Sequence, residues 1–84
     1  MNDQSPMAVR LREVMAQVLD LPPGDIGPQI STETASAWTS LTHLMLISQL
    51  ESEFGVVFSS QEVRGLTSFS AILDALERRR DSVA

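Results

Sequence analysis

One serine of this chain, Ser40, stands where a side-chain hydroxyl could do chemistry. It follows a long loop and begins a stretch whose apolar residues recur at helical spacing. A hydroxyl at the start of a helix lies at the positive end of the helix dipole, beside backbone N–H groups that have no partner within the helix. A phosphate attached covalently to Ser40 would be favoured at that position. Taken alone, the serine could equally be an ordinary residue of a helix start, where serine is common.

Two neighbours could take part in chemistry at Ser40. The single histidine, His43, lies one helical turn further on and could approach the hydroxyl. No carboxylate stands at helical spacing to orient its ring, and a Ser–His hydrolase would also need an oxyanion hole and a cleft, which so short a chain rarely provides. We therefore expect a surface histidine, in contact with solvent or a partner, and no catalytic residue. Thr39 is interpreted as the cap of the helix.

The composition excludes several classes of function. The net charge of −5, with six arginines and no lysine, argues against binding to nucleic acids or to anionic membranes. There is no cysteine to form a disulfide or bind a metal, and one histidine cannot make a multi-histidine metal site. No apolar run approaches the ~20 residues that span a bilayer, and residues 1–4 lack the features of a signal peptide. We expect one soluble cytoplasmic domain over residues 1–84, with its core at about 6–80.

The elements that position Ser40 begin with a helix and a long loop. Ser5 and Pro6 predict the helix start, as a capping serine and a proline in the first turn, and the Pro-Pro-Gly run at 22–24 predicts its end. Its apolar stripe comprises Met7, Leu11, Val14, Met15, Val18, Leu19 and Leu21. The residues from there to Trp38 are rich in Pro, Gly, Ser and Thr and predict a loop of a length that is usually functional or a hallmark of the fold.

Three further helices are predicted. The second runs from about Ser40 to Phe54 and stops at Gly55; its apolar stripe comprises Leu41, Leu44, Ile47, Leu50 and Phe54, with Met45 and Leu46 on an adjacent face. A capping box predicts a short helix at about 60–64, and a last helix follows that bears Phe69, Ile72, Leu73 and Leu76 and ends in a solvated run of arginines at 78–80. The predicted fold class is all-α: a small four-helix bundle of three longer helices and one short helix, with a long loop between the first two.

This order of elements, together with the pair Ser40-Leu41, resembles the acyl and peptidyl carrier protein family over about residues 7–80. The runs Thr42-His43-Leu44 and Leu50 to Gly55 are also similar to carrier-protein sequences. Members of the family carry a 4'-phosphopantetheine arm on the serine of a Leu-Gly-x-Asp-Ser-Leu motif. The resemblance implies that Ser40 is the attachment site and that a phosphopantetheinyl transferase modifies it from coenzyme A. It also implies, as further partners, enzymes that activate and transfer acyl or aminoacyl groups.

The chain departs from the family motif in ways that bear on function. Thr39 stands in place of the aspartate and can still cap the helix, but it lacks the carboxylate that in the family helps the transferase and its magnesium ion to engage the site. Ser36 and Ala37 replace the Leu-Gly pair and remove an apolar anchor from the loop. Trp38 either replaces that anchor by packing against the bundle or contacts a partner.

The second predicted helix also carries fewer acidic residues than is usual in the family. We expect weak electrostatic steering of partners by this helix, and a more apolar contact surface around Met45 and Trp38 that suits a dedicated partner. Five apolar residues could line an acyl pocket between the helices or form ordinary core: Leu46, Leu50, Phe58, Val63 and Leu66.

The sequence therefore predicts a free-standing acyl or aminoacyl carrier protein of fatty acid or secondary metabolite biosynthesis. The domain would catalyse nothing itself, and nothing in the sequence asks for more than a monomer. Two alternatives remain open. One is a protein-interaction module that keeps the carrier fold but is never modified, and the other is a small enzyme that uses Ser40 and His43.

Overall fold

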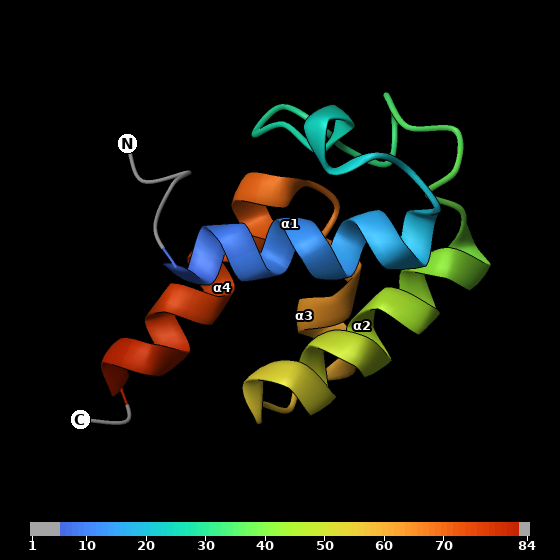
Figure 1. Cartoon of the computed structure of the whole chain (residues 1–84). Coiled ribbons are helices and arrows are strands. Elements are labelled where there is room, and N and C mark those ends of the chain that lie inside the picture. Colours follow the sequence, from blue (N-terminus) through green and yellow to red (C-terminus); the bar gives the residue numbers. More distant parts are fainter. Residues whose placement is uncertain (1–5, 83–84) are drawn as a thin grey trace.

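The computed structural model describes residues 6–82 and consists of helices joined by loops (Figure 1). Three longer helices are α1 (Pro6–Leu19), α2 (Ser40–Phe54) and α4 (Phe69–Ser82), and the short one is α3 (Ser60–Gly65). A single 3-10 turn, Pro23–Asp25, interrupts the long connection between α1 and α2. The predicted all-α class, the three longer helices with one short helix and the position of the long loop are confirmed. The predicted cap Ser5 lies outside the described residues.

Local sequence signals end both long helices before the loops that follow them. In α1 the chain turns at Asp20, whose φ of 57° is left-handed, and the Leu21 N–H donates to the Ala16 carbonyl at 3.0 Å. In α2 the same turn is made by Gly55, with a φ of 65°. This closing geometry satisfies carbonyl groups that the last turn of a helix leaves without partners. The predicted stop at Gly55 is confirmed, and α1 ends slightly before its predicted stop.

The core is formed by one face of α1 packed against α2 and α4. The long loop and the segments around α3 also contribute buried side chains. The buried apolar residues of the described chain are Ala8, Leu11, Val14, Met15, Ala16, Leu19, Ile26, Trp38, Leu46, Ile47, Leu50, Phe58, Leu66, Phe69, Ile72, Ala75 and Leu76.

Helix α2 faces the core with a different set of residues from the one its periodicity suggested. Leu46, Ile47 and Leu50 are buried, whereas Leu41 and Leu44 are 68% and 63% exposed. The prediction that these two belong to the core-facing stripe was wrong. Seven of the fifteen residues of α2 are large and apolar and surround the helix, so the spacing fits more than one buried face. Packing against α1 selects among them.

The loop between α1 and α2 is attached to the rest of the molecule at several points (Figure 1). Its Ile26 side chain is buried, and the Arg12 guanidinium of α1 donates to the Ile26 carbonyl at 3.0 Å. Further along, two backbone hydrogen bonds tie the loop to the connection between α3 and α4 and to the first residue of α4: Thr32 N–H to Thr67 O at 2.9 Å and Phe69 N–H to Ile30 O at 3.0 Å. These contacts bring the loop back to the start of α2.

Arg79 of α4 connects the end of the bundle to α3. It donates to Glu62 Oε1 at 2.6 Å and to the Val57 carbonyl at 2.9 Å, and it lies over the Phe58 ring at 4.6 Å from the centroid. Of the predicted solvated arginines, Arg79 is therefore a structural residue; the Arg80 side chain lies outside the described residues. The carboxylate of Glu62 also accepts from the Ser59 N–H at 2.9 Å, which completes the capping box of α3.

These contacts predict an acid dependence of stability. The hydrogen bond from Arg79, followed by that from the Ser59 backbone, lowers the pKa of Glu62 from 4.5 to about 2. As the pH falls, Glu62 is therefore protonated in the unfolded chain before it is protonated in the folded one. The contribution of its ionised carboxylate to the free energy of unfolding is complete above pH 4.5 and is lost as the pH falls towards 2. Denaturant unfolding at pH 5 and pH 3 should show this loss, and Glu62→Gln should reduce it. Glu33→Gln, an exposed loop variant, should leave it unchanged; equal behaviour of the two variants would contradict the assignment.

Candidate functional site at the start of helix α2

The first turn of α2 is capped by its own threonines. Thr39 has extended backbone angles, and its hydroxyl accepts from the Thr42 N–H at 3.3 Å. In return the Thr39 N–H donates to Thr42 Oγ1 at 2.8 Å, and that hydroxyl donates to the Ala37 carbonyl at 2.8 Å. The N–H groups of Thr39 and Thr42 at the helix start thus find acceptors without the Ser40 hydroxyl. The interpretation of Thr39 as the cap is confirmed.

Ser40 is the first residue of α2, and its side chain is exposed. Within residues 6–82 its hydroxyl makes no hydrogen bond, because the capping role is filled by Thr39 and Thr42. A group attached to this oxygen would therefore displace no existing contact. It would lie beside the free N–H groups at the positive end of the helix.

The side chains of Trp38 and His43 are joined directly beneath this turn. The Trp38 ring is buried, with 3% of its surface exposed, and its Nε1–H donates to His43 Nδ1 at 2.9 Å. The other ring nitrogen, His43 Nε2, lies 2.9 Å from the Val63 carbonyl of α3. An indole nitrogen can only donate, so Nδ1 must be the acceptor, and a carbonyl can only accept, so Nε2 must carry the proton. The histidine is neutral in this arrangement.

Two expectations about these side chains are resolved by the contacts. His43 is half-buried and bonded at both ring nitrogens, so the expectation of a solvated surface histidine was wrong. Trp38 is an anchor of the loop, the first of the two alternatives considered for it. Both nitrogens of His43 point to other partners, so the geometry offers no general base to the Ser40 hydroxyl.

A shallow groove runs beside Ser40 and brings together three segments of the chain. It is lined by Thr32, Trp38, Thr39, Ser40, His43, Val63, Arg64 and Thr67. Hydroxyl groups and one guanidinium are side chains that can bind a phosphate oxygen, so this set fits a phosphodiester on the serine. Sequence reasoning missed Arg64 and Thr67, and nothing local could have indicated them, because only the packing of α3 against α2 places them here.

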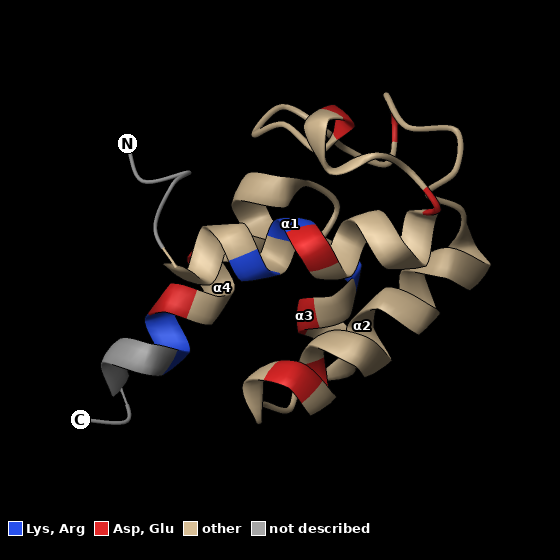
Figure 2. Ribbon diagram, in the orientation of Figure 1, with Lys and Arg blue, Asp and Glu red and all other residues tan. Residues whose placement is uncertain are grey.

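The outward face of α2 is apolar close to Ser40. Leu41, Leu44 and Met45 are exposed, and the last two share a surface hollow with Val18 of α1. We call these four residues the apolar patch. The sequence from Ser40 to Leu50 contains no Asp, Glu, Lys or Arg, as the tan length of α2 in Figure 2 shows.

Both carboxylates of α2 are held at its far end by structural contacts. Glu53 binds Arg10 of α1, with Arg10 Nε donating to Glu53 Oε1 at 2.9 Å, and Glu51 accepts from the Phe58 N–H at 2.9 Å. Neither of them lies near Ser40 along the helix. This distribution matches the expectation of few charges on α2 near Ser40. Of the two residues expected at an apolar contact surface, Met45 is exposed, but Trp38 is buried and takes no part in an exposed surface.

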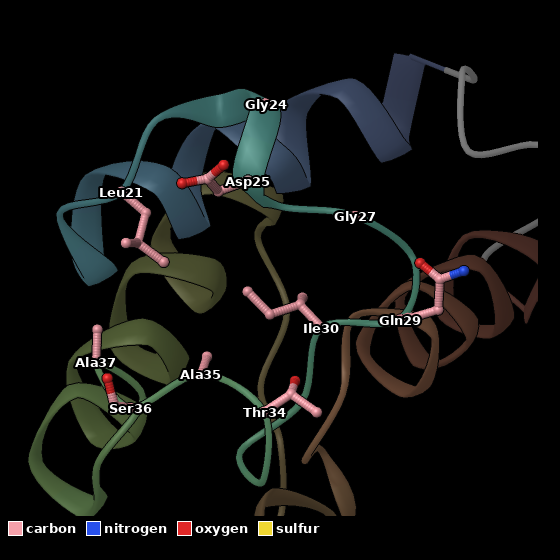
Figure 3. Close-up of a pocket in the computed structure, with 10 residues that line it drawn as sticks. All are labelled: Leu21, Gly24, Asp25, Gly27, Gln29, Ile30, Thr34, Ala35, Ser36 and Ala37. Carbon is pink, nitrogen blue, oxygen red and sulfur yellow. The ribbon is translucent and has the colours of Figure 1, made fainter.

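A second hollow, which Ser40 does not line, lies under the long loop (Figure 3). The side chains of Leu21 and Ile30 border it, and Ser36 and Ala37 lie along its edge. These last two are the small residues that stand in place of a Leu-Gly pair. The missing leucine side chain is thus compatible with an open space under the loop, while Trp38 supplies the buried anchor.

The residues considered for an acyl pocket belong to the packed interior. Leu46, Leu50, Phe58 and Leu66 are buried, and Val63 is half-buried. In this structure they form ordinary core, the alternative left open for them.

No helix among residues 6–82 is long and apolar enough to cross a membrane.

Comparison with protein families identifies the chain. Residues 9–76 match the model of the phosphopantetheine attachment site family. The match covers most of the sequence, and the chain belongs to this family, whose members are carrier proteins with 4'-phosphopantetheine attached covalently to a serine. Such carrier domains are not catalytic themselves; they work with a phosphopantetheinyl transferase and with biosynthetic enzymes. A search of curated proteins found no match.

Proposed function

We propose that Ser40 is the attachment site and that the chain acts as a free-standing carrier of an acyl or aminoacyl group, held as a thioester on the arm. One observation carries the proposal: the Ser40 hydroxyl is exposed and uncommitted at the positive end of α2, because Thr39 and Thr42 cap the helix instead. Family membership supplies the chemistry, since the group is carried on a serine.

In this proposal the domain tethers and presents its cargo, and its partners do the catalysis. Ser40 Oγ attacks the phosphate of coenzyme A that carries the pantetheine arm, and the phosphoanhydride bond to that phosphate breaks. Adenosine 3',5'-bisphosphate leaves, and the transferase takes up the proton of the serine hydroxyl. The thiol of the arm then holds the cargo as a thioester. The chain itself contains no cysteine, so the arm supplies the only thiol. Tethering raises the effective concentration of the cargo at each partner enzyme. We place this work in the cytoplasm, where coenzyme A is available, and assign the carrier as a monomer.

Intact mass after incubation with coenzyme A, Mg²⁺ and a broad-specificity phosphopantetheinyl transferase tests the site. Wild type should gain one arm and Ser40→Ala none, while Ser48→Ala, an exposed serine two turns along the same helix, should behave as wild type. Circular dichroism should show that all three are folded. A folded wild type that gains no arm, in the test tube or in its native host, would favour the unmodified interaction module instead. Modification of Ser40→Ala would place the site elsewhere.

Replacing the cap should change the rate of modification. Thr39→Asp restores the carboxylate beside Ser40 and should speed modification by up to about tenfold, equivalent to about 1.4 kcal/mol in the barrier. Thr39→Asn is the matched control, since asparagine caps a helix about as well as aspartate but brings no charge. The initial rate of modification, followed by intact mass, should be higher for Thr39→Asp than for wild type or Thr39→Asn. Equal rates for all three would mean that the missing carboxylate does not limit the reaction.

A further inference from the structure

The link between Trp38, His43 and Val63 joins three parts of the molecule that meet at Ser40. Trp38 belongs to the end of the long loop, two residues before the serine; His43 lies in the first turn of α2; and Val63 lies in α3. The Trp38 indole is buried, and no buried side-chain nitrogen or oxygen of the described chain lacks a hydrogen-bond partner. His43 is the partner of that indole, so the imidazole holds the loop and α3 against the same helix turn.

We propose that His43 is a positioning residue for Ser40: its neutral imidazole links the Trp38 indole to the Val63 carbonyl, and gain of a second ring proton breaks the link to Trp38. The chemistry of the three groups requires this behaviour. An indole N–H and a protonated Nδ1–H are both donors, so they cannot bond to each other. The contact to Val63 survives, because Nε2 remains a donor in the charged ring.

The loss of the hydrogen bond between Trp38 and His43 changes the conformation of the backbone that leads into α2. With its N–H unpaired, the buried indole must move towards another acceptor or water, and the backbone leading to Ser40 moves with it. Of the residues that line the groove together with His43, Arg64 of α3 is the one that carries a charge, and the loop and α2 contribute hydroxyls and apolar atoms there. The charged residues of α2, Glu51 and Glu53, lie beyond Leu50.

The chain contains one tryptophan and one histidine, so each half of the link has an unambiguous signal. In ¹⁵N-labelled protein at pH 8, the imidazole should show the tautomer with the proton on Nε2. On acidification, followed until the ¹⁵N signals report a charged ring, the indole N–H resonance and the tryptophan fluorescence should change with the same midpoint. In His43→Gln, which has no imidazole, both signals should stay constant over the same pH range.

Two results of this titration would overturn the inference. One is the tautomer with the proton on Nδ1 at pH 8, and the other is an indole signal that stays constant while the imidazole gains its proton. Neither measurement requires modification of the protein, so failure of the proposed function at Ser40 would leave this test intact.

The effect of the link on modification of Ser40 rests on the proposed function, and it is measured in a separate experiment. Trp38→Phe keeps an aromatic ring but removes the N–H together with the pyrrole part of the indole, and it should lower kcat/KM for modification by about two- to tenfold, the range expected for one hydrogen bond. His43→Ala should lose a similar factor, and His43→Ala in the Trp38→Phe background should add little, because the link is already broken. Fully independent losses in the double variant would show that the two side chains act separately. Ser48→Ala serves as the unaffected reference.

Discussion

Leu46→Ala should lower the free energy of unfolding by about 2–5 kcal/mol, whereas Leu44→Ala should change it by less than about 0.5 kcal/mol. Both variants remove the same atoms from the same helix. Leu46 is 0% exposed in the core, and its loss removes buried apolar contacts and leaves a cavity; Leu44 is 63% exposed in the apolar patch. Urea unfolding followed by circular dichroism, with both variants compared to wild type at one pH, measures the difference.

The pair of variants is its own control, because helix propensity changes equally in both. Similar losses, or a larger loss for Leu44→Ala, would mean that α2 presents its other apolar face to the core. Leu44→Ala carries a second expectation, since the apolar patch lies next to Ser40. It should raise KM for a partner enzyme that contacts the patch while leaving stability unchanged, a separation that a core residue cannot show.

Trp38→Ala should lower the free energy of unfolding by about 3–5 kcal/mol. The buried indole is the largest side chain that the long loop contributes to the interior, and its removal also leaves His43 Nδ1 without its donor. Domains of this size are stable by about 5–15 kcal/mol, so the variant should melt at a much lower temperature than wild type. Thermal unfolding followed by far-UV circular dichroism measures the loss without relying on the tryptophan signal.

Leu41→Ala is the comparison for this variant. Leu41 lies next to Ser40 in the sequence but is 68% exposed, and its replacement should cost less than about 0.5 kcal/mol. A loss below about 1 kcal/mol for Trp38→Ala would revive the interpretation of this residue as a partner contact. Trp38→Phe should fall between the two, since it keeps much of the buried area and loses the N–H.

Sequence and structure agree most closely where the signal is local in the chain. The cap at Thr39, the stop at Gly55 and the capping box at Ser59 and Glu62 each depend on residues within one helical turn of one another. These short-range rules placed Ser40 at the start of α2. The family match is consistent with the same reasoning, because the order and spacing of the helices are also properties of the sequence.

Expectations about exposure were less reliable, because exposure depends on which segments close over a side chain. Leu44 and His43 are neighbours with opposite outcomes: the leucine was expected inside and is exposed, and the histidine was expected in solvent and is half-buried. Arg79 was likewise expected to be solvated at the helix end, but it contacts Glu62 and the Phe58 ring.

By itself, then, the sequence determined the helical class, the helix ends and a serine at the positive end of α2, since turns, caps and periodicity act over a few residues. Only the tertiary structure decided which face of α2 is buried and how the surroundings of Ser40 are held. The contact from Trp38 to His43 and the contact from His43 to Val63 join three elements, and α3 supplies Arg64 to the groove. Such contacts form only when separate segments pack together, because several arrangements of an apolar helix satisfy the same spacing.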